Sequence, residues 1–322
     1  MCAALADPSP PQAIDLRSVD VETLAPTLAE QIAEWKNTLD WDFTPSANLV
    51  RRFVQMHVLT GYALVLRGDP RHTIGYSYYV CEDGKGLIGD LYLQKQHRNW
   101  ENENVLFHAS LDAMWQTPGV HRIESQLLML SDAANRRLPY PNWFQSFPRL
   151  FLEAPSNLRL PARKLSSSIS IFPWTEAWQE ATGRLIAGAY QSHIDSQIND
   201  QYRSAIGARR FLTNIVQYPG CGSFFAPASF AASAAGALCG VCLASLVSAD
   251  VGHITQVCVA PSYQGKGLGY ELVRRSMEAL GTHGCRAVSL TVTGANESAL
   301  RLYRNMGFLQ RRAFSAYVWE PK

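Results

Sequence analysis

Three glycines alternate with other residues between a predicted strand and a predicted helix, in the segment Gln264 to Gly269. Side chains of alternating polarity over 250–261 predict the strand, and apolar residues at helical spacing over 268–280 predict the helix, with Gly281 as its C-terminal cap. Glycines let the backbone approach a ligand closely, and the first turn of a helix offers unpaired N–H groups to an anion. A tight turn without a ligand needs only one glycine, so the three glycines and Lys266 predict a phosphate-binding loop.

Two familiar nucleotide-binding loops do not fit this segment. A P-loop needs Ser or Thr directly after its lysine to hold magnesium, whereas Gly267 follows Lys266. A dinucleotide-binding loop needs a third glycine where this chain has Tyr270, and it is expected near the start of its domain. The phosphate-bearing ligand is therefore expected to be of another kind.

The glycine segment resembles the acetyl-CoA signature R/Q-x-x-G-x-G/A of the GNAT N-acetyltransferase superfamily. The residues in the signature positions are Gln264, Gly267 and Gly269. A second block, from Asn296 through Tyr303 to Phe308, is similar to the family's helix that carries a tyrosine and leads through Gly-Phe into a strand. The two blocks follow each other in the family's order and cover about residues 250–308.

The resemblance implies an α/β (α+β) fold with a mixed, splayed, mostly antiparallel sheet flanked by helices. It also implies acetyl-CoA as co-substrate between two diverging strands, without a metal, and a bulge that frees backbone groups for the pantetheine arm. The residues assigned in this way are Val257, Cys258 and Val259 for the pantetheine, Gln264, Gly265, Lys266, Gly267, Leu268 and Gly269 for the pyrophosphate, and Asn296 for a polar contact. Asn296 is equally well explained as an ordinary helix N-cap, and both roles can hold.

Two side chains are expected to move protons in such a reaction. Acetyl transfer from a thioester to an amine needs a neutral amine, a donor for the carbonyl oxygen as it gains charge, and a proton for the departing thiolate. Tyr303 matches the family tyrosine near the sulfur and would supply this proton, although its spacing from Leu300 alone is that of a core tyrosine.

His253 aligns with a catalytic glutamate of some family members and would accept the amine's proton. Alternation along the strand places it on the same face as Val257, although a bulge between them would reverse this. The alternative is a half-buried structural histidine. A backbone N–H of Val257 or Cys258 is the expected donor to the carbonyl oxygen.

The acceptor is expected against the segment Ala187 to Tyr202, which corresponds to the family's first helices. Its side chains that suit a cationic amine, or alternatively form a solvated polar face, are His193, Asp195, Asp200 and Tyr202. The acceptor would be the amine of a small molecule or a peptide. The expected function is an acetyl-CoA-dependent N-acetyltransferase acting by direct attack in the C-terminal half, and the alternative is a non-enzymatic acyl-CoA-binding or regulatory module.

An internal repeat divides the 322-residue chain into two halves. Residues 87–106 align without a gap on residues 253–272, so that Arg98 falls on Gln264. Prolines, serines and basic residues over 154–168 indicate the boundary. The predicted division is a flexible tail at 1–13, a degenerate GNAT-like domain at 14–160 and an acetyl-CoA-binding GNAT domain at 161–322.

The first copy of the loop has lost two glycines, because Glu101 and Glu103 stand at the positions aligned with Gly267 and Gly269. Two carboxylates would face a pyrophosphate there. We therefore expect no acetyl-CoA in the first copy, which would serve as a scaffold, a dimer surface or a wall of the substrate site.

Composition narrows the classes of partner. The 29 Lys and Arg residues against 27 Asp and Glu leave a charge of +2, and they are dispersed, so no nucleic acid is expected. The uncharged run 230–249 predicts a buried β-hairpin rather than a membrane span, with Cys239 and Cys242 as packed strand residues rather than a metal or redox pair. Seven irregularly spaced cysteines favour a reducing, cytoplasmic location, and a homodimer stays open.

Overall fold

The computed structural model describes residues 10–66, 69–130, 137–218 and 220–321. They form two compact units that differ from two consecutive halves of the chain. The first unit consists of Met1–Lys36, Phe43–Phe147 and Phe314–Lys322, and the second of Asn37–Asp42 and Pro148–Ala313.

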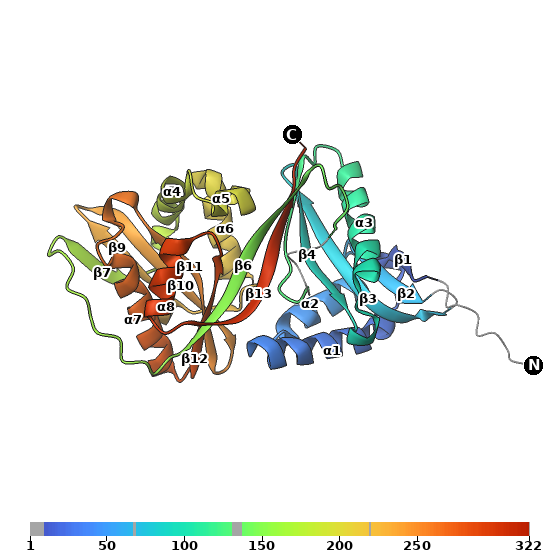
Figure 1. Ribbon diagram of the computed structural model, residues 1–322, viewed down its shortest axis with the longest axis horizontal. Coiled ribbons are helices and arrows are strands. Elements are labelled where there is room, and N and C mark those ends of the chain that lie inside the picture. The colour runs from blue at the N-terminus through green and yellow to red at the C-terminus, as the bar shows by residue number, and fades with distance from the viewer. Residues whose placement is uncertain (1–9, 67–68, 131–136, 219, 322) are drawn as a thin grey trace, which may run out of the picture. The chain divides into compact units, whose positions relative to one another are not determined.

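The first unit is a mixed sheet flanked by helices (Figure 1). Its elements are β1 (Gln12–Asp15), α1 (Val21–Leu39), α2 (Thr44–Gln55), β2 (Gly61–Leu66), β3 (Asp69–Glu82), β4 (Lys85–Leu93), α3 (Trp100–Gln116), β5 (Arg122–Gln126) and β13 (Leu309–Trp319). The strand order is β1-β2-β3-β4-β5-β13, with β4 and β5 parallel and the other pairs antiparallel. Helix α3 buries Leu106, Phe107 and Leu111 against this sheet, and α1 reaches it through a buried hydrogen bond from Gln31 to Asp90.

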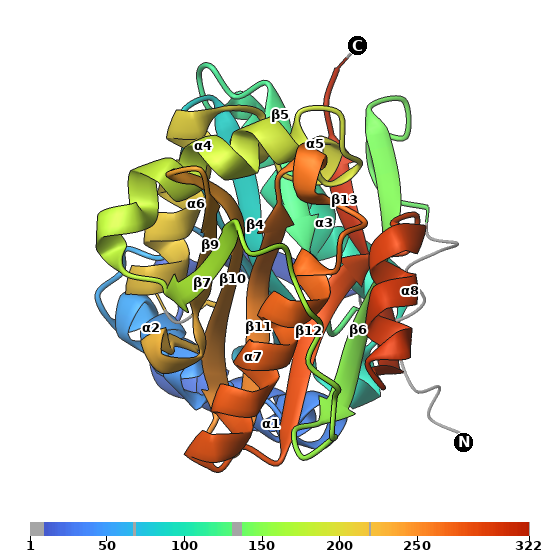
Figure 2. The same ribbon diagram turned by 90° about the vertical axis from the view of Figure 1, so that its left-hand side faces the viewer.

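The second unit repeats this plan (Figure 2). Its elements are β6 (Phe144–Pro155), β7 (Ile169–Pro173), α4 (Gln179–Tyr190), α5 (Asp195–Ile198), α6 (Ala205–Gln217), β8 (Ser223–Phe224), β9 (Phe230–Ala234), β10 (Ala237–Ser248), β11 (Val251–Val259), α7 (Leu268–His283), β12 (Ala287–Thr293) and α8 (Glu297–Asn305). The order β6-β12-β11-β10-β9-β7 has one parallel pair, β11 with β12. Apolar residues of α7 and α8 form one core, and those of α4 and α6 form another. The predicted α/β class with mostly antiparallel sheets is confirmed.

Each unit completes its sheet with the last strand of the other repeat. Strand β6 ends the first repeat and pairs with β12 from Arg149↔Thr293 to Pro155↔Ala287, while β13 ends the second repeat and pairs with β5. The units therefore divide inside these two strands, after Phe147 and after Ala313, instead of between residues 160 and 161. The repeat could not indicate this exchange, because both strands hold the same place in their own copies.

Several local predictions can be compared with the observed elements. The run 230–249 forms the hairpin β9–β10, in which Cys239 and Cys242 are buried, as predicted. Helix α7 continues through Gly281 to His283, and its C-cap is instead Gly284, whose φ of +106° suits a glycine. The predicted tail 1–13 lies outside the described residues up to residue 9, and residues 12–13 belong to β1. Among the described helices, none is long and apolar enough to cross a membrane.

Candidate active site

Strands β11 and β12 separate partway along their length. They pair from Val251↔Ala287 to Ile254↔Leu290, although β11 continues to Val259 and β12 to Thr293. At the same place the register between β10 and β11 shifts, which leaves Thr255 as the extra residue of a bulge. The three residues expected to hold the pantetheine arm follow this bulge directly.

The opening between the two strands belongs to a cavity of about 830 Å³ within the second unit. The predicted site residues that line it are Val257, Cys258, Val259, Gln264, Gly265, Gly267, Gly269, Asn296 and Tyr303. Three others do not line it. Leu268 is buried in the core, the Nζ of Lys266 donates to the carbonyl oxygen of Ser262 at 2.7 Å, and His253 lies deeper in the sheet.

The glycine loop has the backbone of an anion site. Gly265 and Gly267 adopt φ values of +71° and +83°, in the left-handed region that disfavours other residues. Gly267 is the N-cap of α7 and has no side chain to bind the first turn, so the N–H groups there are not capped by that residue. Gln264 is held against the end of β11 by a hydrogen bond from its Nε2 to the carbonyl oxygen of Val259, 3.0 Å long.

Arg163 brings a positive charge to this loop. Its Cδ lies 3.3 Å from the position that a Cβ on Gly267 would take, and its guanidinium lies over the ring of Tyr270 at 4.4 Å. Arg163 also lines the cavity. Arg163 was not predicted as a site residue, because it belongs to the segment 154–168, whose composition indicated only a domain boundary.

Tyr303 lies on α8 with its ring 5.7 Å from that of Phe308, and it is 8% exposed. It lines the cavity, and its hydroxyl makes no hydrogen bond with any residue in the described part of the chain. Burial, and then the charges of Cys242 and Asp195, raise its pKa. The phenol therefore keeps its proton at neutral pH and can donate it into the cavity, while the ring also packs in the core.

His253 has the surroundings of a structural residue. It is 4% exposed, its Nδ1 lies 2.9 Å from the Ser289 hydroxyl, and its ring contacts those of Trp41 and Phe151 at 5.1 and 5.9 Å. Burial and the positive charge of Arg149 lower its pKa to about 3. The ring is therefore neutral at pH 7, and it does not line the cavity. The role of His253 as base remains a prediction, and this position argues against it.

The bulge also reverses the face on which His253 was expected. Ile254 and Val257 contact the core under α7, whereas Cys258 belongs to the core under α4 and α6. With Thr255 as the extra residue, alternation shifts by one, so His253 shares a face with Cys258 and not with Val257.

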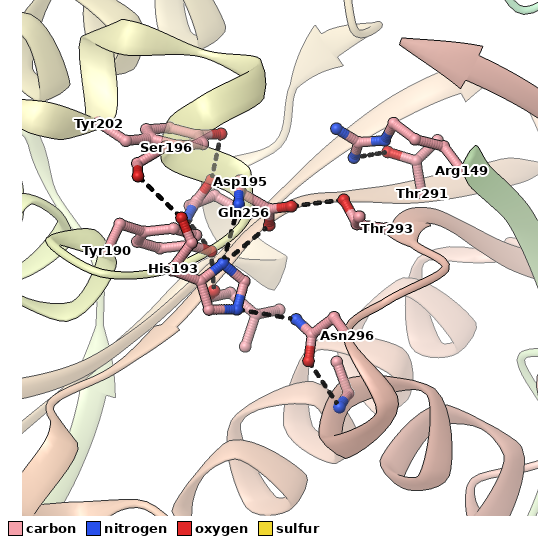
Figure 3. Close-up of polar contacts among 12 residues, drawn as sticks. Arg149, Tyr190, His193, Asp195, Ser196, Tyr202, Gln256, Thr291, Thr293 and Asn296 are labelled. Atoms are coloured by element: carbon pink, nitrogen blue, oxygen red, sulfur yellow. Dashed lines mark hydrogen bonds and ion pairs between the residues drawn. The ribbon is translucent and has the colours of Figure 1, made fainter. Parts of the chain in front are cut away.

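A partly buried series of hydrogen-bonded polar groups lines the cavity beside α4 (Figure 3). The Tyr202 hydroxyl donates to Gln256 Oε1 at 3.2 Å, Gln256 Nε2 donates to the Tyr190 oxygen at 3.1 Å, and the Tyr190 hydroxyl donates to the carbonyl oxygen of Val257 at 3.1 Å. Tyr202 was predicted here, whereas Tyr190 and Gln256 were not, since an aromatic residue and an amide within apolar stretches give no distinct signal. These hydrogen bonds join Tyr190 and Tyr202 to β11 at the cavity.

A second polar group joins the start of α5 to β12 and α8 (Figure 3). Asp195 accepts a short hydrogen bond from the Thr293 hydroxyl, and its carboxylate lies 3.6 Å from His193 Nδ1. His193 Nε2 lies 3.2 Å from Asn296 Nδ2, and Asn296 Oδ1 accepts from the backbone N–H of Ala299 at 3.1 Å. The N-cap role of Asn296 is thus observed. His193 and Asp195 line the cavity, whereas Asp200 does not, and a role of the first two in holding an amine stays a prediction.

Comparisons with known proteins agree with this geometry. Residues 194–308 match the model of the acetyltransferase (GNAT) family. Over 66 residues the chain is 35% identical to N-alpha-acetyltransferase MAK3 of Arabidopsis thaliana, which covers 20% of this chain and 35% of that protein. Over 68 residues it is 39% identical to mycothiol acetyltransferase of Rhodococcus jostii, which covers 21% of this chain and 22% of that protein. The chain thus spans about a third or less of the length of these relatives.

Solved structures match over nearly the whole chain. A GCN5-related N-acetyltransferase from Sphaerobacter thermophilus has a TM-score of 0.66 at 16% identity, covering 96% of this chain and 95% of that one. A tandem GNAT protein from the clavulanic acid biosynthesis pathway has a TM-score of 0.63 at 13% identity, covering 97% and 99%. Residues 194–308 are thus similar to the acetyltransferase (GNAT) family, and the described chain shares its fold with solved GNAT proteins, one of them a tandem form.

Proposed function

We propose that the chain is an acetyl-CoA-dependent N-acetyltransferase whose reaction takes place in the second unit. The observation that carries this proposal is the cavity between β11 and β12, because it joins an uncapped glycine loop to the unbonded hydroxyl of Tyr303. A loop alone would suit many phosphate compounds. The glycine loop, the unpaired edge of β11 and the hydroxyl of Tyr303 lie at one cavity. This combination suits a ligand that has phosphates at one end and a thioester at the other.

The residues present fit acetyl-CoA. The backbone of 265–269 and the cation of Arg163 would hold the pyrophosphate, since amides at a helix N-terminus and a guanidinium both favour an anion. The edge of β11 beyond Ile254, which does not pair with β12, would receive the amides of the pantetheine arm. Acetyl-CoA would supply the acetyl group as a thioester and leave as a thiol.

The chemistry left to the protein is orientation and proton transfer. The amine nitrogen forms a bond to the acetyl carbon as the carbon–sulfur bond breaks, the amine loses one proton and the sulfur gains one. Tyr303 would give its proton to the sulfur, and the raised pKa of the phenol keeps this proton available until the thiolate forms. The carboxyl group of Asp195 lines the cavity and would attract the cationic amine before the amine loses its proton.

The test is amine-dependent release of the CoA thiol, with the acetylated product identified by mass. The test variant is Gly267→Glu and its matched control is Gly236→Glu. Both glycines have a positive φ, +83° and +79°, and only Gly267 lies at the cavity. We expect the first variant to lose turnover and the second to keep it. A wild-type protein that binds acetyl-CoA and acetylates no amine would instead favour the alternative, an acyl-CoA-binding module without catalysis.

A further inference from the structure

Arg149 is an arginine of the cavity without an ion-pair partner among the described residues. Arg149, on β6, is half-buried and lines the cavity, and its Nη2 donates to the Thr291 hydroxyl at 3.3 Å. Its Nε is buried without a hydrogen-bond partner, and no carboxylate among the described residues forms an ion pair with it. A buried guanidinium N–H without a partner is costly, so this position is suited to an anion from outside the chain.

A carboxylate lies on the neighbouring threonine. Thr291 and Thr293 are two residues apart on β12, so they point to the same face, roughly 7 Å apart along the strand. Arg149 binds the first threonine and Asp195 the second, and the structure records no ion pair between the two charges. In Figure 3 the guanidinium of Arg149 points towards the group around Asp195.

Tyr202 lies within the influence of both charges. Burial is the largest cause of its raised pKa, the Asp195 carboxylate raises it further, and the Arg149 guanidinium lowers it. Arg149 and Asp195 both line the cavity, and the structure records no ion pair between them. Such a pair is complementary to a ligand that carries both signs of charge.

We propose that the acceptor is an aminocarboxylic acid, with its carboxylate on Arg149 and its amine beside Asp195. This inference rests on the proposed acetyl transfer and adds the class of acceptor. The planar fork of an arginine matches a carboxylate with two parallel hydrogen bonds, and Nε is one of the two donors in that arrangement. The phosphates of acetyl-CoA have their own place at the glycine loop beside Arg163, so Arg149 is left for the acceptor.

The experiment compares acceptors that differ only in this charge. A panel of α- and ω-amino acids and their carboxamides is assayed for kcat/KM with wild type, Arg149→Met and Arg149→Lys. Arg304→Met is the control, because Arg304 is exposed and does not line the cavity. Differences in amine basicity within a pair cancel when the acid-to-amide ratio is compared between proteins.

We expect wild type to prefer the acids and Arg149→Met to lower the acid-to-amide ratio about 10- to 100-fold, as for the loss of a charged hydrogen bond. Arg149→Lys should keep part of the preference, and Arg304→Met should keep all of it. A ratio that Arg149→Met leaves unchanged would overturn the proposal. A preference for aminophosphonates over the matched amino acids would overturn it as well, since the anion would then be a phosphate.

A binding measurement separates this inference from the proposed function. Calorimetry of the CoA-loaded protein with the same acids and amides needs no turnover. Acid-selective binding that Arg149→Met abolishes supports the inference even if no amine is acetylated, an outcome that would refute only the acetyl transfer. Turnover of amines without any selectivity for the acids refutes only the inference.

Discussion

The pH dependence of folding tests whether His253 is a buried, neutral residue. Burial and the charge of Arg149 lower its pKa from 6.5 to about 3, whereas unfolding restores the ordinary value. Below pH 6.5 the unfolded state takes up a proton that the folded state refuses, so this residue's contribution to stability is lost as the pH falls from 6.5 towards 3. The loss reaches about 1.4 kcal/mol per pH unit, which gives about 2 kcal/mol at pH 5.

The perturbation is His253→Asn, which removes the titrating ring and keeps a polar group for Ser289. At pH 7 we expect the variant to be less stable than wild type, because it loses the ring contacts with Trp41 and Phe151. At pH 5 this difference should shrink by about 2 kcal/mol. Only wild type takes up a proton at this position on unfolding, and this uptake stabilises its unfolded state. The assay is urea unfolding at both pH values, followed by tryptophan fluorescence and circular dichroism.

Two results would decide against this reasoning. Equal pH dependence in wild type and His253→Asn would refute a lowered pKa. A limb near pH 6.5 in the kcat/KM profile that disappears in the variant would restore His253 as the base. The control is Ser289→Ala, which removes the hydrogen-bond partner of the ring and leaves the ring buried, so it should keep the wild-type pH dependence.

The other predictions concern the cofactor loop and the proton donor. Gly267→Glu should weaken acetyl-CoA binding by at least about 100-fold, because it adds a carboxylate at the proposed anion site and an ion-pair partner for Arg163. Calorimetry measures the affinity. An unchanged affinity would show that this loop does not bind the pyrophosphate. Wild type should bind one equivalent of acetyl-CoA per chain, and two equivalents would contradict the loss of the first site. Tyr303→Phe should lower turnover by about 100-fold with little change in acetyl-CoA affinity, while full turnover in the folded variant would make Tyr303 a core residue only. Arg163→Met should raise the dissociation constant for CoA about 10-fold. An equal effect on the dissociation constant for pantetheine, which has no phosphate, would contradict a phosphate contact of Arg163.

The glycine loop and the helix with Tyr303 were predictable because each depends on a few adjacent residues. A positive φ at Gly265 and Gly267 needs glycine whatever surrounds it, and Asn296 caps the helix that directly follows it. These features place the loop, the end of β11 and α8 at one cavity. Local chemistry thus indicated the side of the cavity that we propose for the cofactor.

The side of the cavity that we propose for the acceptor could not be predicted in the same way. Arg149 comes from a strand of the first repeat that pairs in the second unit, so no spacing along the chain connects it with Asp195. The face of His253 depends on one extra residue at Thr255, and nothing in an alternating strand shows which residue is extra. Both depend on strand pairing, which is decided by contacts far apart in the sequence.

In the first copy the aligned segment has a different backbone, because α3 already begins at Trp100 and Glu101 lies inside this helix. Asn99 caps α3 by accepting the N–H of Asn102 at 2.8 Å, so a side chain occupies the helix N-terminus that stays uncapped in the second unit. Arg98, at the first position of the signature, makes two hydrogen bonds of 2.8 and 2.7 Å to Glu34. The carboxylate of Glu34 therefore holds the cation that a phosphate would need. Glycines at the positions of Glu101 and Glu103 alone would leave both the cap by Asn99 and this ion pair in place, so we expect that they would not create acetyl-CoA binding in the first unit.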